Sequence, residues 1–209
     1  MKLTRNIFIL FFAVLVFTPV IAQETIEDLP PGIEQNKDPG IGRMKGDQIF
    51  SFNAGLLLPL FTSDTDWNFE SGFEHLSLGG VGSLEWSGHL NSNLFVGGQL
   101  SGMFAVTPNQ RTFTMVPICA RVGYIFNLHP ITIPITLAAG FSFNNLDDLF
   151  EFTPIIKPGA SFYWNINYEW SVGFNLNYWW VPEFHTGDLA GQTRFGNFLE
   201  TSFSAAYYF

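Results

Sequence analysis

Four charged residues in alternating segments of the chain could form ion pairs inside a barrel. Beyond Gln48 the chain has four basic residues, and two of them, Arg121 and Lys157, fall on polar faces of such segments. Glu85 and Glu200 fall on the same kind of face. Counted in residues from the segment ends, Glu85 and Arg121 lie at a similar height in the barrel, and Lys157 and Glu200 lie at a second, similar height. We therefore predict a lumen charge network with these two pairings. The network would either plug a low-dielectric lumen or act as a gate that exchanges partners to admit a small solute.

The acidic residues between the segments suit hard divalent cations, which prefer oxygen ligands. The principal candidates are Asp64, Asp66, Asp147 and Asp148, with Glu70, Glu74, Glu151, Glu183 and Asp188 in the same loops. No loop has the spacing of an EF-hand. We therefore expect a solvated acidic surface, no bound metal and no cofactor.

Catalysis of the lipid-A-modifying kind would need a histidine beside a serine and a carboxylate. The histidines all fall in expected loops or turns: His75, His89, His129 and His185. Only His185 has acidic neighbours, Glu183 and Asp188, and Thr186 is a poor substitute for the missing serine. We therefore expect solvated histidines and no catalytic residues. The single cysteine, Cys119, excludes a disulfide framework and is expected to be a small buried hydrophobe.

Eight segments alternate with period two, which is typical of strands with two unlike faces. They span residues 48–60, 76–87, 94–106, 114–126, 131–143, 154–166, 168–181 and 195–209. One face carries aromatic and branched aliphatic residues, and the other carries mostly Ser, Thr, Asn and Gly. Only 13% of the residues are charged, against roughly 25% in soluble domains. The pattern predicts an all-β fold, an eight-stranded antiparallel up-and-down transmembrane β-barrel with a lipid-facing apolar surface and a small polar interior.

The connections between the segments alternate in length. Those at 61–75, 107–113, 144–153 and 182–194 are mostly longer, and those at 88–93, 127–130 and 166–168 are short. We expect the loops on the cell surface and the turns facing the periplasm. An aromatic girdle is expected near the turns, from Trp86, Tyr124, Phe126, Trp164, Tyr168 and Trp170.

Four prolines fall inside the expected strands, where each removes a ladder hydrogen bond: Pro117, Pro134, Pro154 and Pro158. A closed barrel has no edge strand for them. Bulges, or strands that protrude beyond the membrane, could accommodate them.

The N-terminal region is typical of an exported protein. Lys2 and Arg5 precede an apolar run that is too short to cross a bilayer, and cleavage is expected after Ala22. Residues 1–22 are therefore predicted to be a signal peptide. Its removal leaves seven basic against 18 acidic residues, so nucleic acid is a poor partner. Residues 23–47 are acidic and rich in Pro and Gly, which predicts a disordered periplasmic tail.

Residues 48–209 resemble the small eight-stranded outer-membrane proteins of the OmpA-barrel, OmpX and OmpW type. The chain's end, Ser204-Ala205-Ala206-Tyr207-Tyr208-Phe209, resembles the family's terminal assembly signal. The resemblance implies a bacterial outer-membrane location, contact with outer-membrane lipid and lipopolysaccharide, and recognition of Tyr207 and Phe209 by the barrel-assembly machinery. OmpW-like is the favoured type, because charges do not dominate the lumen-facing residues.

Three classes of function follow. The first, which the OmpW resemblance implies, is a non-enzymatic barrel that stabilises the envelope or passes small apolar molecules through a lateral opening. An open diffusion pore is not expected, because eight strands enclose a space that side chains can fill. The second is a surface adhesin or receptor that acts through the acidic loops. The third is a lipid-A-modifying enzyme.

Overall fold

The computed structural model describes residues 45–66, 68–146, 149–184 and 193–209, which belong to the compact unit Lys37–Phe209. The predicted signal peptide over 1–22 and the predicted tail as far as residue 44 lie outside the described residues. Residues 45–47, the end of that tail, hydrogen-bond to the end of a strand: the Gly46 N–H donates to the His89 carbonyl at 3.0 Å, and the His89 N–H donates to the Asp47 carbonyl at 2.8 Å.

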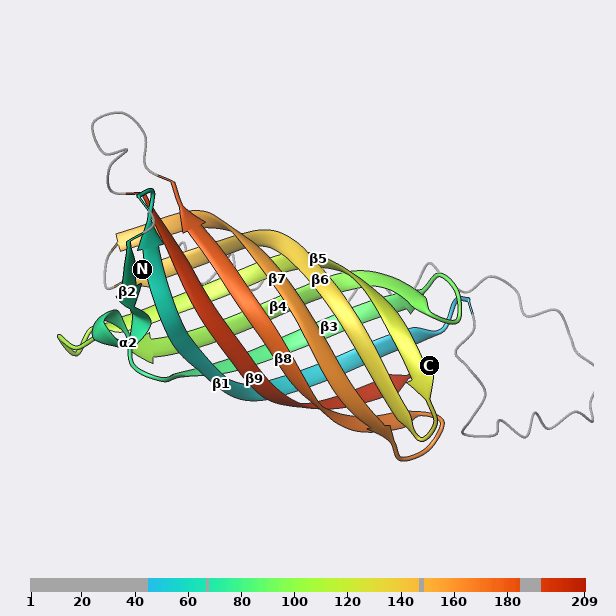
Figure 1. Ribbon diagram of the computed structural model, residues 1–209. Coiled ribbons are helices and arrows are strands. Elements are labelled where there is room, and N and C mark those ends of the chain that lie inside the picture. The colour runs from blue at the N-terminus through green and yellow to red at the C-terminus, as the bar shows by residue number, and fades with distance from the viewer. Residues whose placement is uncertain (1–44, 67, 147–148, 185–192) are drawn as a thin grey trace, which may run out of the picture. The chain divides into compact units, whose positions relative to one another are not determined.

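Eight strands form a closed antiparallel barrel. They are β1 Gln48–Asp64, β3 Gly79–His89, β4 Leu94–Val106, β5 Thr112–Leu128, β6 Ile131–Leu146, β7 Leu149–Asn165, β8 Trp170–Glu183 and β9 Arg194–Tyr208. Consecutive barrel strands pair with one another, and β9 returns to pair with β1 (Figure 1). The predicted up-and-down barrel is confirmed.

The loop side of the barrel carries two short elements. The strand β2, Phe69–Ser71, pairs with the end of β1, and the helical turn α2, Gly72–His75, follows it. Both lie at the end of the barrel opposite the C-terminus (Figure 1). The second barrel strand therefore begins at Gly79, three residues later than predicted. No helix in the described ranges is long and apolar enough to cross a bilayer.

Apart from β3 and β4, the strands reach further toward the loops than predicted, most clearly between β6 and β7. The expected loop at 144–153 was wrong, since β6 runs to Leu146 and β7 begins at Leu149. The physical reason is that Asn144, which suggests a loop, faces the lumen and donates a side-chain hydrogen bond to Thr153 Oγ1 at 2.9 Å. From the sequence alone, a polar residue at this point is compatible with the end of a strand or with a loop.

The two faces of the strands are as predicted. Phe203 is 75% exposed and Phe52 is 57% exposed, while the alternating Ser202 and Asn53 are 0% and 1% exposed. The large exposed side chains lie on all eight strands, so the barrel presents a continuous apolar surface. Such a surface is stable when hydrocarbon covers it.

The four prolines that the sequence places inside strands do lie within strands, and the strand register is the same on either side of them. At Pro117, Pro134 and Pro158 the pairing with one neighbouring strand lapses for two residue pairs and then resumes in the same register. No bulge is present at these positions. The one register shift recorded among the described strand pairs lies between Pro59 and Phe61, where β1 pairs with β9.

Aromatic side chains mark both ends of the apolar surface. Trp170 and the other predicted girdle residues lie near the turns, and Trp180 and Phe195 lie near the loops, where their rings stack at 5.9 Å. Trp170 and Trp180 are ten residues apart on β8. With about 3.3 Å per residue and a tilt of roughly 40°, they stand about 25 Å apart along the barrel axis, which is the height of the apolar band of outer-membrane barrels.

Candidate functional site

The ion pair nearer the turns joins Glu85 on β3 to Arg121 on β5. An Arg121 guanidinium N–H donates to one oxygen of Glu85, and the Gln99 amide donates to the other at 2.7 Å. The guanidinium also lies over the ring of Phe95, 5.4 Å from its centroid. Phe95 has room because Gly123 is its register partner: a Cβ there would lie 2.3 Å from the ring. Both charges are thus compensated within the barrel.

The second ion pair joins Lys157 on β7 to Glu200 on β9, with Nζ 3.5 Å from Oε2. Glu200 also accepts hydrogen bonds from Trp179 Nε1 at 2.7 Å and from Ser202 Oγ at 3.2 Å. Lys157 donates to Ser101 Oγ at 3.2 Å and lies 4.0 Å from the centroid of the Trp179 ring. Both pairings predicted from the sequence are therefore present, and each carboxylate has several donors.

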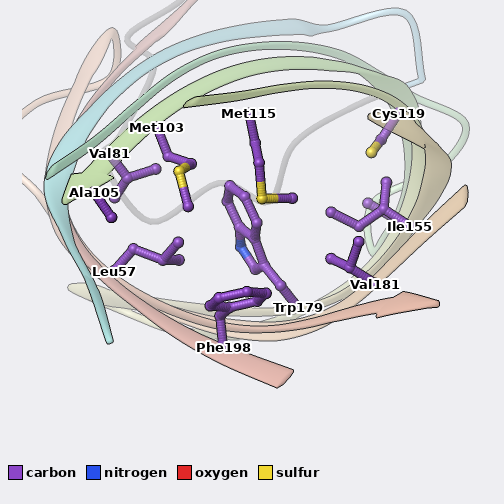
Figure 2. Close-up of a cluster of buried hydrophobic side chains, with 11 residues drawn as sticks. Leu57, Val81, Met103, Ala105, Met115, Cys119, Ile155, Trp179, Val181 and Phe198 are labelled. Atoms are coloured by element: carbon purple, nitrogen blue, oxygen red, sulfur yellow. The ribbon is translucent and has the colours of Figure 1, made fainter. Parts of the chain in front are cut away.

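An apolar cluster fills the loop-side half of the lumen around Trp179, which is 0% exposed. Figure 2 shows side chains from around the wall pointing toward this ring, with Met115 and Phe198 on its two sides. The other members are Leu57, Val81, Met103, Ala105, Cys119, Ala138, Ile155 and Val181. Leu76, just after α2, packs against the cluster. The predicted small polar interior is therefore wrong for this half of the barrel.

The cluster and the ion pairs together occupy much of the lumen. An eight-stranded barrel has an interior that side chains can fill, and here buried side chains from every barrel strand project into it. Trp179, Phe95 and Gln99 were not among the residues predicted for the charge network. The alternation of the strands places each of these residues on the lumen face, so their orientation could have been predicted. Their contact partners could not, because these depend on how far the side chains reach across the lumen.

The predicted acidic candidates do not form a cation site in the described part of the chain, where no group of three potential metal ligands occurs. The Asp64 carboxylate instead accepts the backbone N–H groups of Asp66 and Asn68, both at 2.9 Å. The Asn68 side chain and backbone hydrogen bonds lower the pKa of Asp64 below its usual value. Asp147 and Asp148 lie outside the described residues.

The histidines divide into different settings. His89, expected to be solvated in a turn, is instead the last residue of β3 and is buried; its Nδ1 lies 3.2 Å from the Asp47 carbonyl oxygen. Its ring lies 6.2 Å from that of Phe95. His129 is in the turn before β6, His75 ends α2, and His185 lies outside the described residues.

The predicted assembly signal lies at the end of β9. The Phe209 N–H donates to the Gln48 carbonyl at 3.0 Å and the Gln48 N–H to the Phe209 carbonyl at 2.8 Å, so the terminal residue joins the sheet beside β1. The rings of Tyr207 and Phe209 stack at 5.9 Å and Phe209 is exposed. Recognition of these rings by assembly machinery stays a prediction.

One seam in the barrel wall lacks pairing at its loop end. The β7–β8 register runs from Asn165↔Ser171 to Ile156↔Trp180 and is not recorded beyond that point, although β7 continues to Leu149. Continuing the register sets Pro154 opposite Pro182, and neither can donate a backbone hydrogen bond. A cavity of about 240 Å³ lies at this seam, lined by residues 151–154 and 182–184.

The seam borders the apolar cluster directly. Ile155 on β7 and Val181 on β8 are opposite in the continued register, and both are buried members of that cluster. Pro158 interrupts the same strand pair again four residues further toward the turns. The wall of β7 and β8 is therefore short of hydrogen bonds where it covers the apolar half of the lumen.

A closed eight-stranded antiparallel barrel with an apolar exterior and a filled interior defines the class of small outer-membrane β-barrel proteins. Two solved structures of that class have the same fold. Neisserial surface protein A is 12% identical, with a TM-score of 0.50, and covers 78% of this chain and 97% of its own. The outer membrane protein OprG from Pseudomonas aeruginosa is 11% identical, with a TM-score of 0.52, and covers 80% of this chain and 98% of its own.

A protein-family model matches residues 36–207 of the chain, and the chain belongs to that family. The matched range includes almost the whole barrel. A protein of Borreliella burgdorferi described as an uncharacterized protein is 28% identical over 160 residues, which cover 66% of this chain and 73% of that protein.

Proposed function

We propose that the protein is a bacterial outer-membrane barrel that passes small apolar molecules laterally through the seam between β7 and β8, the role that the OmpW resemblance implies. The single observation that carries this proposal is the unpaired loop end of the seam, with Pro154 opposite Pro182, directly over the apolar cluster. An apolar molecule would enter from the loop side, displace side chains of the cluster and leave between the two strands into lipid.

The character of the lumen favours apolar cargo over ions or polar solutes. The loop-side half offers Met103 and Met115, whose unbranched side chains repack at little cost. Further in, the two ion pairs block the axis, and breaking either one would leave a buried charge without its partner. The lateral exit lies before a molecule reaches the pair formed by Glu85 and Arg121.

A disulfide across the seam tests the proposal. Ile155→Cys and Val181→Cys, in a Cys119→Ala background, place two lumen-facing thiols opposite each other. Oxidation should lower the uptake of the apolar fluorophore N-phenyl-1-naphthylamine by expressing cells to the rate of cells without the protein, and reduction should restore it. The measurement is the rate of fluorescence increase.

The matched control closes a seam that is already paired. Ser142→Cys with Thr153→Cys joins β6 to β7 at lumen-facing partners in the recorded register, also on β7. Its oxidation should leave uptake unchanged. Equal uptake by the oxidised β7–β8 variant and the wild type would exclude passage through this seam and leave a structural role in the envelope as the better account.

A further inference from the structure

Two buried asparagines in the lumen each have an amide oxygen without a hydrogen-bond donor among the described residues. Asn53 on β1 and Asn175 on β8 are each 1% exposed, and the Oδ1 atom of each is unpartnered. Their amide nitrogens are engaged, because Asn53 Nδ2 donates to Ser83 Oγ at 2.9 Å. Asn175 Nδ2 donates to Ser202 Oγ at 3.5 Å. Turning either amide over would leave its nitrogen unpaired instead. A buried polar atom without a partner is costly, so both oxygens point to a bound hydrogen-bond donor.

The strand register brings the two asparagines to neighbouring positions of the lumen wall. Asn53 is the partner of Ser204 on β9. Asn175 is the partner of Ser202 on the other side of the same strand. Ser202 and Ser204 are both buried and face the lumen, since successive residues of a strand point to opposite faces. The two unpartnered oxygens therefore flank one strand and belong to the same part of the lumen.

This part of the lumen lies between the two ion pairs. On its loop side, Ser202 donates to the Glu200 carboxylate at 3.2 Å. On its turn side, the Tyr163 hydroxyl lies 2.8 Å from Ser204 Oγ. Tyr163 also lines a cavity of about 30 Å³ beside Glu85. A cavity of this size has room for about two water molecules.

The exposure of the two ion pairs indicates the side from which water can enter. The side chains of Arg121 and Glu85 are 10% and 7% exposed. Those of Lys157 and Glu200 are each 1% exposed. The apolar cluster around Trp179 covers the second pair on the loop side. Water therefore has access from the turn side, through the cavity at the first pair.

The chemistry of the site favours water over a metal cation. Lys157 donates to Ser101, which is the register partner of Ser83. A positive charge therefore lies close to Asn53 and would repel a metal cation. Water is neutral and donates two hydrogens, and buried water typically makes about three hydrogen bonds. The serines around the two oxygens are short, so a ligand of this size needs little displacement of the wall.

We propose that Asn53 and Asn175 bind ordered water between the two ion pairs. Each Oδ1 accepts a hydrogen from this water, which continues into the cavity beside Glu85 and so to the turn side of the barrel. The turn-side half of the lumen is then hydrated as far as these asparagines. The site is independent of the proposed lateral passage, because Glu200 separates it from the apolar cluster.

Contacts of the asparagine side chains with water test the site. The folded full chain, isotope-labelled and in detergent micelles, is measured by NMR for magnetisation transfer from water to side-chain amide hydrogens. Asn53 and Asn175 should both show cross-peaks with water. Asn144 is the matched control, because it is 3% exposed and both of its amide atoms are engaged, by Ser142 Oγ and Thr153 Oγ1. It should show no cross-peak, although hydroxyl groups adjoin it as they adjoin the other two asparagines.

Leucine substitutions test whether the two oxygens hold the same water. Asn175→Leu should lower the Asn53 cross-peak about fivefold, because the water loses one of its hydrogen bonds. Asn53→Leu should lower the Asn175 cross-peak for the same reason. Asn144→Leu is the control substitution and should leave both cross-peaks unchanged. Heat-dependent gel mobility verifies that each variant folds.

Three results would overturn the proposal. The first is the absence of water cross-peaks at Asn53 and Asn175 in the wild type. The second is an equal cross-peak at Asn144, which would mean that neighbouring hydroxyls relay the magnetisation. The third is a leucine variant at either position that leaves the cross-peak of the other asparagine unchanged. The comparison with Asn144 needs no substitution, so it decides the proposal even if neither leucine variant folds.

Discussion

At the scale of single residues, Glu200 illustrates how a buried charge is kept in a narrow barrel. Its carboxylate accepts from the Trp179 indole and the Ser202 hydroxyl and faces the Lys157 ammonium. The same ammonium lies over the indole ring, so the three side chains from β7, β8 and β9 form one unit. Removing one partner leaves the other charge buried, while removing both charges together leaves a neutral interior.

We predict that Glu200→Gln destabilises the barrel by about 3 kcal/mol, because Lys157 then remains charged and buried. The double variant Glu200→Gln with Lys157→Met should regain most of that loss. Urea unfolding in lipid vesicles, followed by tryptophan fluorescence, measures both. Glu151→Gln, at an exposed position of β7, is the control and should change stability by less than about 0.5 kcal/mol.

A double variant no more stable than Glu200→Gln would show that the lysine charge is not the cause of the loss. Planar-bilayer recording of the same proteins separates a plug from a gate. Ion conductance that appears only in Glu200→Gln would favour the gate.

The lumen pairs could be predicted because both members of each pair are charged and alternation fixes which face they occupy. The position of Trp179 on the lumen face follows from the same alternation. Its role between Lys157 and Glu200 does not, because it depends on how far side chains from three strands reach across the interior. Asn197 lies on the outward face of β9 and is nevertheless buried. This could not be predicted either, since it depends on the register shift where β1 pairs with β9.

At the scale of the strands, the prolines determine where the wall is weak. Pro158 remains paired with Leu137 on β6, and the pairing lapses on the side of β8. The missing N–H is therefore one that would have joined β7 to β8. The sequence predicts that each proline removes one backbone hydrogen bond, but it does not show which of the two neighbouring strands loses that bond.

We predict that Pro158→Val restores pairing between β7 and β8, because valine supplies the missing N–H and its side chain faces lipid. One added hydrogen bond of about 1 kcal/mol should slow amide exchange in the adjoining residues of both strands about fivefold. Hydrogen exchange read by NMR or mass spectrometry measures the change. Ala160→Val, on the same face where the ladder is intact, should leave exchange unaltered. Unchanged exchange in Pro158→Val would mean that another interaction opens the seam.

Boundaries of strands were less predictable than their number. The alternation of large apolar and small polar residues identified all eight barrel strands. It did not predict that Asn144 and Thr153 belong to strands, because asparagine and threonine are common both on a lumen-facing strand and in a loop. The elements β2 and α2, of three and four residues, are too short to show a periodic pattern and were not expected within the first loop.

At the scale of the whole molecule, the apolar surface has a defined height. The turn-side ring at Trp170 and the loop-side ring at Trp180 are about 25 Å apart along the axis, less than the roughly 30 Å of an average hydrocarbon core. A rigid closed barrel gains little by tilting, because tilting exposes one rim while it buries the other. The mismatch between the barrel and the bilayer is therefore relieved mainly by a local change in bilayer thickness.

We therefore predict that the denatured chain folds most completely into vesicles of short-chain phosphatidylcholine and that the yield decreases as the acyl chains lengthen, because thicker bilayers must thin around the barrel. Folded fraction is measured by heat-dependent gel mobility and by far-UV circular dichroism. Trp180→Ser, which removes one loop-side anchor, should weaken the dependence on thickness. Efficient folding in buffer without lipid or detergent would contradict the membrane assignment itself, since exposed rings such as Phe203 would then have to be stable in water.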